Sequence, residues 1–184
     1  MRTLFKLSSA ILFVLVVGCA NIGGPAASLD EKSCVGMVIN PPPGMLHETS
    51  DTLKLKLLTD AEQSLGEGGL CTGKVFVAQT PITVYRLWGT EVGGSKGNWW
   101  SLSYPENSRE NYRKKNVMCT EWNQLNMMIA CTLPANTAVV IGPGQSVSTC
   151  DNNILLPQSP ANQVYIPDAN RILENCSSTD WLGL

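Results

Sequence analysis

From Lys74 to Trp88 the chain reads KVFVAQTPITVYRLW, two runs of β-branched and aromatic residues separated by Gln79-Thr80-Pro81. Residues of this kind favour extended strands, and a proline between two such runs is typical of a turn. We therefore expect strands over residues 75–77 and 82–88. A glycine-rich loop over residues 89–97 follows them.

Similar short segments continue the β pattern, and we expect further strands over residues 99–103, 127–133, 137–141 and 163–166. Ser50 or Asp51 can cap a helix that runs to about Leu65, where Gly66 ends it, and a second helix is expected over residues 106–115. Five or six strands and two or three short helices without an internal repeat predict the α+β class. The expected architecture is a small single domain with a split antiparallel or mixed β core, braced by disulfides.

The amino terminus predicts export. Met1, Arg2 and Lys6 precede an apolar run over residues 7–17, which is too short to span a bilayer comfortably and is typical of a removable signal peptide. The run ends in Val-Val-Gly-Cys, which resembles the bacterial lipobox and implies that Cys19 is acylated after removal of residues 1–18. The alternative is an ordinary signal peptide that is cleaved near Ala20 or at residues 26–27.

A lipidated chain would attach to a membrane, because two or more acyl chains give stable anchoring. Residues 19–33 are then expected to be a flexible tether, and residues 34–184 a single globular domain. The expected location is the outer membrane or cell surface, and otherwise the periplasm or the medium.

The cysteines support an oxidising compartment. Besides Cys19 the chain has six, an even number that in an exported protein indicates disulfides, with 15 possible connectivities that remain open. No two of them form a C-x-x-C pair and His47 is the only histidine, so we expect no metal site. The six are Cys34, Cys71, Cys119, Cys131, Cys150 and Cys176.

Charge and motifs exclude several classes. With 13 basic and 15 acidic residues, the chain lacks the positive charge of a nucleic-acid-binding protein. There is no P-loop, dinucleotide-binding glycine motif, nucleophile elbow or zinc-protease motif. A catalytic triad would have to use His47, and no paired carboxylates suggest an ordinary glycosidase.

A series of polar residues lies within the β-type segments. Arg86 interrupts an apolar strand, where a cation is costly unless an anion or ligand meets it. Residues 97–105 combine glycine, tryptophan and serine, Arg113 follows on the second helix, and Gln163 lies in the last strand. The candidate residues are Arg86, Trp99, Trp100, Ser101, Arg113 and Gln163.

This order resembles the ADP-ribosyltransferase-like superfamily, and within it the NAD glycohydrolase domain of tuberculosis necrotizing toxin and its relatives. The similarity covers about residues 75–167. Here, residues 155–162 replace the family's glycine-rich approach to its glutamine. The family's Glu-x-Glu pair is also missing, which argues against arginine-directed protein ADP-ribosylation.

The resemblance implies an exported, toxin-like or nucleotide-scavenging hydrolase that cleaves the nicotinamide–ribose bond of NAD, with NAD as substrate and no permanently bound cofactor. Arg86 and Arg113 would bind the pyrophosphate, because a guanidinium can contact two oxygens at once. Ser101 would bond the nicotinamide ribose or carboxamide, and Trp99 or Trp100 would form an aromatic wall. Gln163 would hold the ribose hydroxyl or the attacking water, so that positioning carries the catalysis.

Each candidate residue has a structural alternative. Arg86 could pair with Glu91 or Glu121, the tryptophans, Trp122 included, could belong to the core, and the serines could be inert. Gln163 could face solvent on the alternate phase of its strand. The competing class is a non-enzymatic surface lipoprotein that binds a protein or a glycan through exposed tryptophans.

Overall fold

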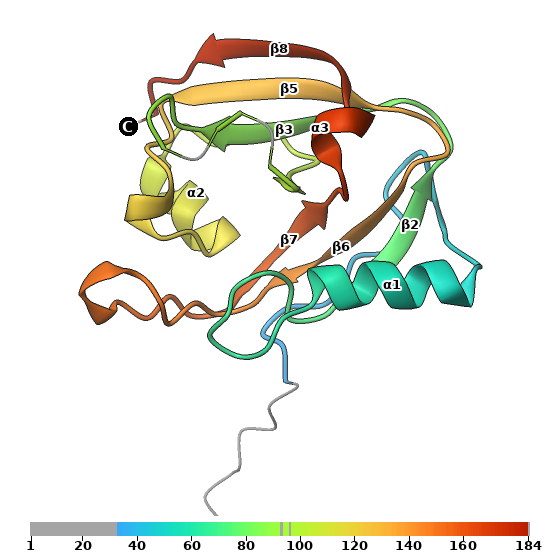
Figure 1. The fold of residues 1–184 in the computed structure, drawn as a ribbon, viewed down its shortest axis with the longest axis horizontal. Helices are drawn as coiled ribbons and strands as arrows, with labels where there is room; N and C mark the ends of the chain where they lie inside the picture. The colour runs from blue at the N-terminus through green and yellow to red at the C-terminus, as the bar shows by residue number, and fades with distance from the viewer. Residues whose placement is uncertain (1–32, 93, 96, 184) are drawn as a thin grey trace, which may run out of the picture.

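The computed structural model of the chain describes residues 33–183, apart from residues 93 and 96 (Figure 1). The predicted signal over residues 1–18, Cys19 and the predicted tether up to residue 32 lie outside the described residues. Within the described part of the chain, no helix is both long and apolar enough to cross a membrane.

The described residues form two antiparallel sheets. The five-stranded sheet has the order β1 (Met45–His47), β2 (Lys74–Ala78), β6 (Ala138–Gly144), β7 (Ser159–Tyr165) and β4 (Trp99–Trp100). The three-stranded sheet has the order β3 (Ile82–Trp88), β5 (Met127–Leu133) and β8 (Glu174–Asp180). In Figure 1 the smaller sheet crosses the top of the domain and the larger one runs diagonally below it.

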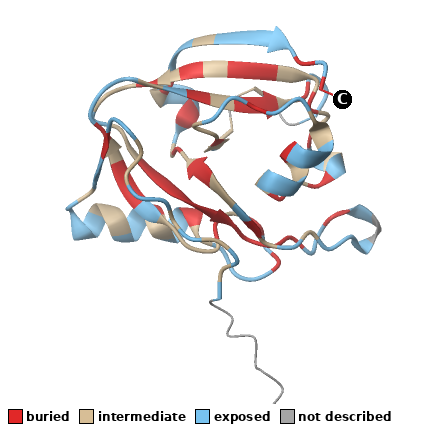
Figure 2. Ribbon diagram, turned by 180° about the vertical axis from the view of Figure 1, so that it is seen from behind, coloured by how far each residue is buried: buried red, intermediate tan, exposed pale blue. Residues whose placement is uncertain are grey.

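The two sheets meet along one line and enclose the main core. Tyr85 of β3 and Ser101, the residue after β4, exchange two backbone hydrogen bonds of 2.8 Å, which link the sheets. Figure 2 shows the buried residues concentrated on the central strands. The core cluster joins residues of the large sheet to residues of the small one, among them Phe76, Val139 and Ile141 with Val84, Ile129 and Leu133.

Three α-helices are described: α1 (Asp51–Ala61), α2 (Arg109–Asn116) and α3 (Ala169–Ile172). Helix α1 covers the outer face of the large sheet, where Leu57 and Ala61 pack against Val75 and Val140. Strand β6 is therefore buried on both faces, which explains its unbroken apolar sequence. Two short 3₁₀ helices, η1 (Thr120–Trp122) and η2 (Asp151–Asn153), are the remaining described elements. Helices and antiparallel sheets together confirm the predicted α+β class.

Three disulfides resolve the connectivity that the sequence left open. They join Cys34 to Cys71, Cys119 to Cys150, and Cys131 to Cys176, across 37, 31 and 45 residues. Bridges over loops of this length each stabilise a fold by about 2–4 kcal/mol, mainly by restricting the unfolded chain. The predicted disulfide bracing is confirmed.

Several predicted boundaries need correction. Strands over residues 82–88 and 127–133 are confirmed, but α1 ends at Ala61 rather than near Leu65. The helix stops early because the backbone there pairs with Leu70, which donates to the Ala61 carbonyl and accepts from the Gln63 amide. These two hydrogen bonds to a residue outside the helix are incompatible with a further helical turn.

The other boundary errors also have local causes. Helix α2 begins at Arg109 rather than 106, because the Ser108 hydroxyl caps it by accepting from the Asn111 amide. Strand β4 ends at Trp100, since the Ser101 side chain forms a tight turn with Ser103. The last predicted strands are also displaced: β6 spans residues 138–144 and β7 spans residues 159–165.

The expected number of strands was wrong. The described residues form eight strands, and the sequence did not predict β1, β8 or helix α3. Strand β8 reads ENCSSTD and is mostly exposed at the edge of the small sheet (Figure 2). An edge strand that buries little apolar surface leaves no hydrophobic alternation in the sequence.

The cap of α1 gives a first prediction. The Ser50 hydroxyl accepts a hydrogen bond from the Leu53 amide, so Ser50→Ala is expected to lower the free energy of unfolding by about 1 kcal/mol. Urea unfolding followed by circular dichroism measures the change. Thr49→Ala, at the exposed position before the cap, is the control and should leave the midpoint unchanged.

Candidate functional site

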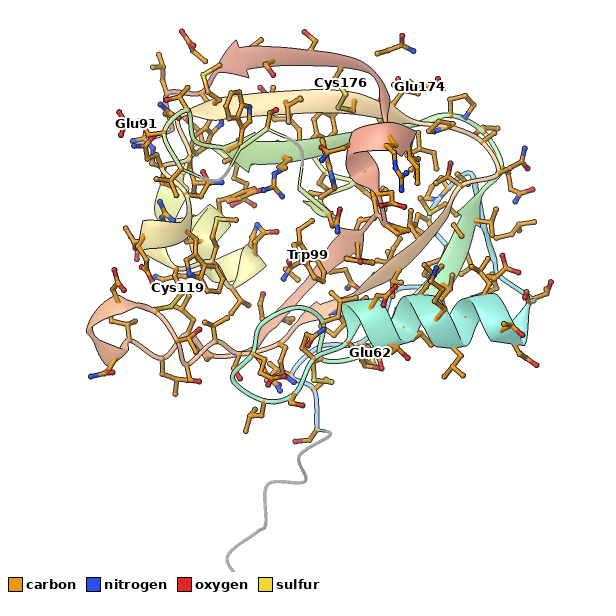
Figure 3. The ribbon with its side chains drawn as sticks, viewed as in Figure 1. Glu62, Glu91, Trp99, Cys119, Glu174 and Cys176 are labelled. Atoms are coloured by element: carbon orange, nitrogen blue, oxygen red, sulfur yellow. A yellow bond between two sulfur atoms is a disulfide. The ribbon has the colours of Figure 1, made fainter. Side chains whose placement is uncertain are left out.

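A cavity of about 200 Å³ lies between strands β3, β4 and β7 and the segment from α2 to η1. Figure 3 shows Trp99 near the middle of the domain, with the ribbon of both sheets around it. Three of the predicted site residues, Arg86, Trp99 and Gln163, line this cavity together. The remaining lining residues are Gly69, Tyr112, Asn116, Val117, Met118, Trp122 and Asn123.

Arg86 is held within the wall by the backbone of β4. Its side chain is only 8 % exposed, and Nη1 donates to the Trp99 carbonyl at 2.9 Å. Burial lowers the pKa of this guanidinium from its ordinary value. An arginine side chain nevertheless keeps its proton in proteins. Gly97 lies directly against it, since a Cβ there would be 2.7 Å from Nη2.

The carboxylates that could have paired with Arg86 are engaged elsewhere. Glu91 accepts a hydrogen bond from Gln124, and Glu121 accepts from the backbone amide of Asp151. These contacts therefore give no support to the alternative that Arg86 forms only an ion pair with Glu91 or Glu121.

Gln163 extends into the same cavity from β7. The residue pairs with Gly142 of β6 and is 5 % exposed, so the alternative in which it faces solvent is wrong. Its side-chain amide makes no hydrogen bond with any described residue and is not among the fully buried unpartnered groups, so it faces the cavity. Gly144 leaves room for it, because a Cβ there would be 2.6 Å from Nε2.

The two adjacent tryptophans of β4 have different surroundings. Trp99 is half-buried, lines the cavity and packs against Tyr165 with ring centroids 5.1 Å apart. Trp100 lies in the main core, and its Nε1 donates to the Gly97 carbonyl at 2.6 Å. Trp99 also packs against the core cluster between α1 and the large sheet, so the core alternative holds in part for Trp99 and fully for Trp100. Its place at the cavity still allows Trp99 to serve as the expected aromatic wall.

Ser101 lies at a second cavity of about 450 Å³, which is also lined by Tyr104, Asn162 and Val164. Tyr112 and Asn116 line both cavities, so the two are neighbours, but Ser101 lines only the larger one and Gln163 only the smaller one. The structure thus separates Ser101 from Gln163. The Ser101 hydroxyl is engaged in the turn with Ser103, as described above.

Arg113 also lies apart from Arg86 and Gln163, and it lines neither cavity. Its guanidinium donates to the carbonyl oxygens of Cys119 and Asn123. Burial, followed by the nearby Arg109 charge, lowers its pKa, whereas Glu121 acts in the opposite direction. Arg113 therefore fixes the segment that forms one wall of the cavity, a role different from the expected phosphate contact.

This role of Arg113 predicts a stability effect. Arg113→Met removes two hydrogen bonds from a charged donor and is expected to lower the free energy of unfolding by about 1–3 kcal/mol. Chemical denaturation measures it. The matched substitution Arg171→Met, at an exposed arginine that pairs only with Asp168, should change the value by less than about 0.5 kcal/mol.

The wall contributed by residues 112–123 was missed by the sequence reasoning. Tyr112 is buried, its hydroxyl accepts from the Leu87 amide, and burial raises its pKa. Trp122 is 41 % exposed at the cavity, and Asn123 is 2 % exposed. The sequence feature that could have identified this wall is the Trp-Asn pair shortly after Cys119. The disulfide of Cys119 holds this segment against the loop before η2.

The charge of the cavity favours an anionic ligand. Arg86 is the only described lining residue that carries a formal charge at neutral pH, and no aspartate or glutamate is among them. Tyr112, Asn116, Asn123 and Gln163 add neutral polar groups, and Trp99 and Trp122 add aromatic faces. The arrangement can bind an anion that also carries hydroxyl or amide groups and a flat ring.

One group of residues has side chains of the types that bind metal ions, but its two cysteines cannot act as thiolate ligands. Cys119, Glu121 and Cys150 place their donor atoms within 4.8 Å of one another. The two cysteines are joined in a disulfide, so they offer no thiolate ligands.

Comparisons with protein-family models, with curated proteins and with solved structures found no match to this chain. The proposals below therefore depend on the geometry of the cavity and on the sequence.

Proposed function

We propose that the protein is an exported NAD glycohydrolase that cleaves the bond between nicotinamide and ribose. The observation that carries this proposal is the meeting of Arg86, Trp99 and Gln163 in one cavity, from strands far apart in the sequence. These three residue types supply a cation for phosphate, an aromatic wall and an amide for hydroxyl groups or water. The Gln163 amide supports a ligand contact, because it faces the cavity and bonds no described residue, which leaves its donors and acceptor for a bound molecule.

The size of the cavity suits part of a dinucleotide. Its volume of about 200 Å³ is below the range of about 300–1,000 Å³ that is typical of sites for whole drug-sized ligands. The nicotinamide–ribose half would occupy it, with a phosphate near Arg86. The exposed Trp122 provides a surface at the cavity for the part of the substrate that remains outside.

The reaction needs little acid–base chemistry from the protein. The C1′–N bond breaks with its electron pair going to the cationic nicotinamide, which leaves as a neutral molecule without a general acid. Water adds to C1′ and releases a proton to solvent, so the products are nicotinamide, ADP-ribose and H⁺. Gln163 orients the ribose hydroxyl or the water, and the preorganised dipoles stabilise the positive charge that develops on the ribose.

Export and lipid anchoring belong to the same proposal. The pairing of six cysteines in three disulfides fits an oxidising compartment, and Cys19 would attach the mature protein to a membrane. At that location the enzyme would act as a toxin-like effector or in nucleotide scavenging.

A second candidate function is a non-enzymatic surface lipoprotein that binds a protein or a glycan. The observation in its favour is the exposure of Trp122, together with Tyr104 at the second cavity, because exposed aromatic side chains are common at such binding sites. This candidate predicts binding without turnover of NAD.

Turnover of a fluorogenic etheno derivative of NAD tests the main proposal. The purified protein should release fluorescent etheno-ADP-ribose, whereas Arg86→Ala and Gln163→Ala should retain at most about 1 % of the parent's kcat/KM. Circular dichroism of each variant checks folding. Equal rates for all three proteins would contradict the site, and no turnover by the parent would favour the binding protein.

The pH dependence of turnover is a further prediction. The titratable lining residues are Arg86, which keeps its proton in the accessible range, and Tyr112, whose pKa lies above its ordinary value near 10 because of burial. We therefore expect kcat/KM to be constant from about pH 6 to pH 9. A bell-shaped profile measured in this range would require a general acid or base and would contradict catalysis by positioning alone.

A further inference from the structure

Asn123 is the second buried side-chain amide in the wall of the cavity. It follows η1 directly, is 2 % exposed, and lines the cavity with Gln163. Its backbone carbonyl accepts from Arg113, and the nearby Cys119–Cys150 disulfide holds the same segment. The position of Asn123 is therefore fixed by contacts on its backbone as well as on its side chain.

The orientation of this amide is determined by its neighbour Leu125. The Leu125 amide donates to Oδ1 of Asn123 at 2.9 Å, in a turn where Leu125 has the left-handed φ of 55°. Only an oxygen can accept that hydrogen bond, so the end of the side chain that carries Nδ2 is the free one. Within the described part of the chain, Nδ2 donates to no acceptor.

We infer that Asn123 is a substrate-binding residue whose Nδ2 donates a hydrogen bond to an oxygen of the bound nicotinamide dinucleotide. The inference rests on the proposed function and adds a residue that the sequence reasoning did not identify. Nδ2 is not among the fully enclosed unpartnered atoms of the described residues, so it faces the cavity that Asn123 lines, where a ligand oxygen can accept its hydrogen bond. Asn123 and Gln163 then bind the substrate through amides from two separate segments, while Arg86 provides the charge.

Two substitutions separate this role from the turn that Asn123 also makes. Asn123→Asp keeps an oxygen for the Leu125 amide but removes the donor, and Asn123→Ser keeps a short acceptor without adding charge. Asn123→Ser should unfold at nearly the same urea concentration as the parent, whereas Asn123→Asp, which places a carboxylate at a 2 % exposed position, should unfold at a lower one. Both should lower kcat/KM for NAD, by about 10- to 100-fold, because a hydrogen bond to the substrate is lost.

The control is the same change at a neighbouring asparagine outside the cavity. Asn126→Asp removes one hydrogen bond to Thr90 in the same segment and lines neither cavity. It should leave kcat/KM within about twofold of the parent. A loss equal to that of Asn123→Asp would overturn the inference, because it would show an effect of charge or of the segment as a whole.

Calorimetric titration with NAD and with ADP-ribose distinguishes this inference from the proposed function. Parent-like kinetics and binding in both Asn123 variants would overturn the inference and leave the glycohydrolase proposal intact. If the parent binds NAD but does not hydrolyse it, the proposed function fails and weaker binding by the variants still supports the inference. If the parent neither binds nor hydrolyses NAD, both are overturned.

Discussion

Replacing Gln163 by methionine is expected to leave the stability of the protein nearly unchanged while it strongly lowers NAD hydrolysis. The two side chains have nearly the same shape, but methionine has no polar group to desolvate. Because the Gln163 amide faces the cavity and bonds no described residue, its replacement removes no hydrogen bond within the described part of the chain and should change the free energy of unfolding by less than about 0.5 kcal/mol. The loss of a positioned dipole should lower kcat by about 10²–10³-fold.

The matched control is the same substitution at a buried glutamine that is fully bonded. Gln145 is 2 % exposed, accepts from the Ser146 amide and from Gln158, and donates to the Gln63 carbonyl. Gln145→Met should therefore lower the free energy of unfolding by about 1–3 kcal/mol and leave the activity of the folded protein intact. Urea unfolding and steady-state kinetics measure both effects. A destabilised Gln163→Met with parental turnover would show that Gln163 is a structural residue.

Removing the Cys119–Cys150 disulfide is expected to lower both the free energy of unfolding and the activity of the candidate site. The bridge closes a loop of 31 residues, and its loss from the Cys119→Ala, Cys150→Ala double variant should lower the free energy of unfolding by about 3–4 kcal/mol. Figure 3 places Cys119 below α2, in the segment that carries Trp122 and Asn123. Without this anchor the wall is less well positioned, and kcat/KM should fall about tenfold at a temperature where the variant is folded.

The Cys131–Cys176 bridge is the control for this prediction. It closes a loop of 45 residues between β5 and β8, so its removal should lower stability by a similar amount. Neither cysteine lines either of the two cavities described above, and kcat/KM of the folded variant should stay within about twofold of the parent. Equal activity in both double variants would show that the cavity wall does not depend on its disulfide.

Local pattern accounts for the elements that the sequence predicted correctly. The strand over residues 82–88 is rich in β-branched and aromatic residues, and its partner over residues 127–133 is almost entirely apolar, which is typical of strands that contribute to a core. The Ser50 cap and the start of α1 also depend on neighbouring residues only. The end of α1 and the edge strand β8 were not predictable in this way, since α1 ends where its backbone pairs with Leu70 in the following loop and β8 pairs with the distant strand β5.

In the candidate site, too, some features could be predicted from the local sequence and others depend on the tertiary structure. Arg86 and Gln163 stood out because a polar side chain within an apolar strand calls for an explanation. Their common cavity results from the order of the strands, in which β7 pairs with β4 and β4 meets β3. Arg113 was an equally good candidate by residue type, yet its guanidinium bonds two backbone carbonyls.

The sequence by itself determined the α+β class, most of the strands, the use of cysteines for disulfides and a short set of candidate polar residues, because composition and periodicity are local properties of the chain. Only the tertiary structure decided which cysteines pair, which candidates share a cavity, and that Asn123 belongs with them. The physical reason is that these contacts join residues far apart in the chain. Their geometry depends on how the two sheets and α2 pack together.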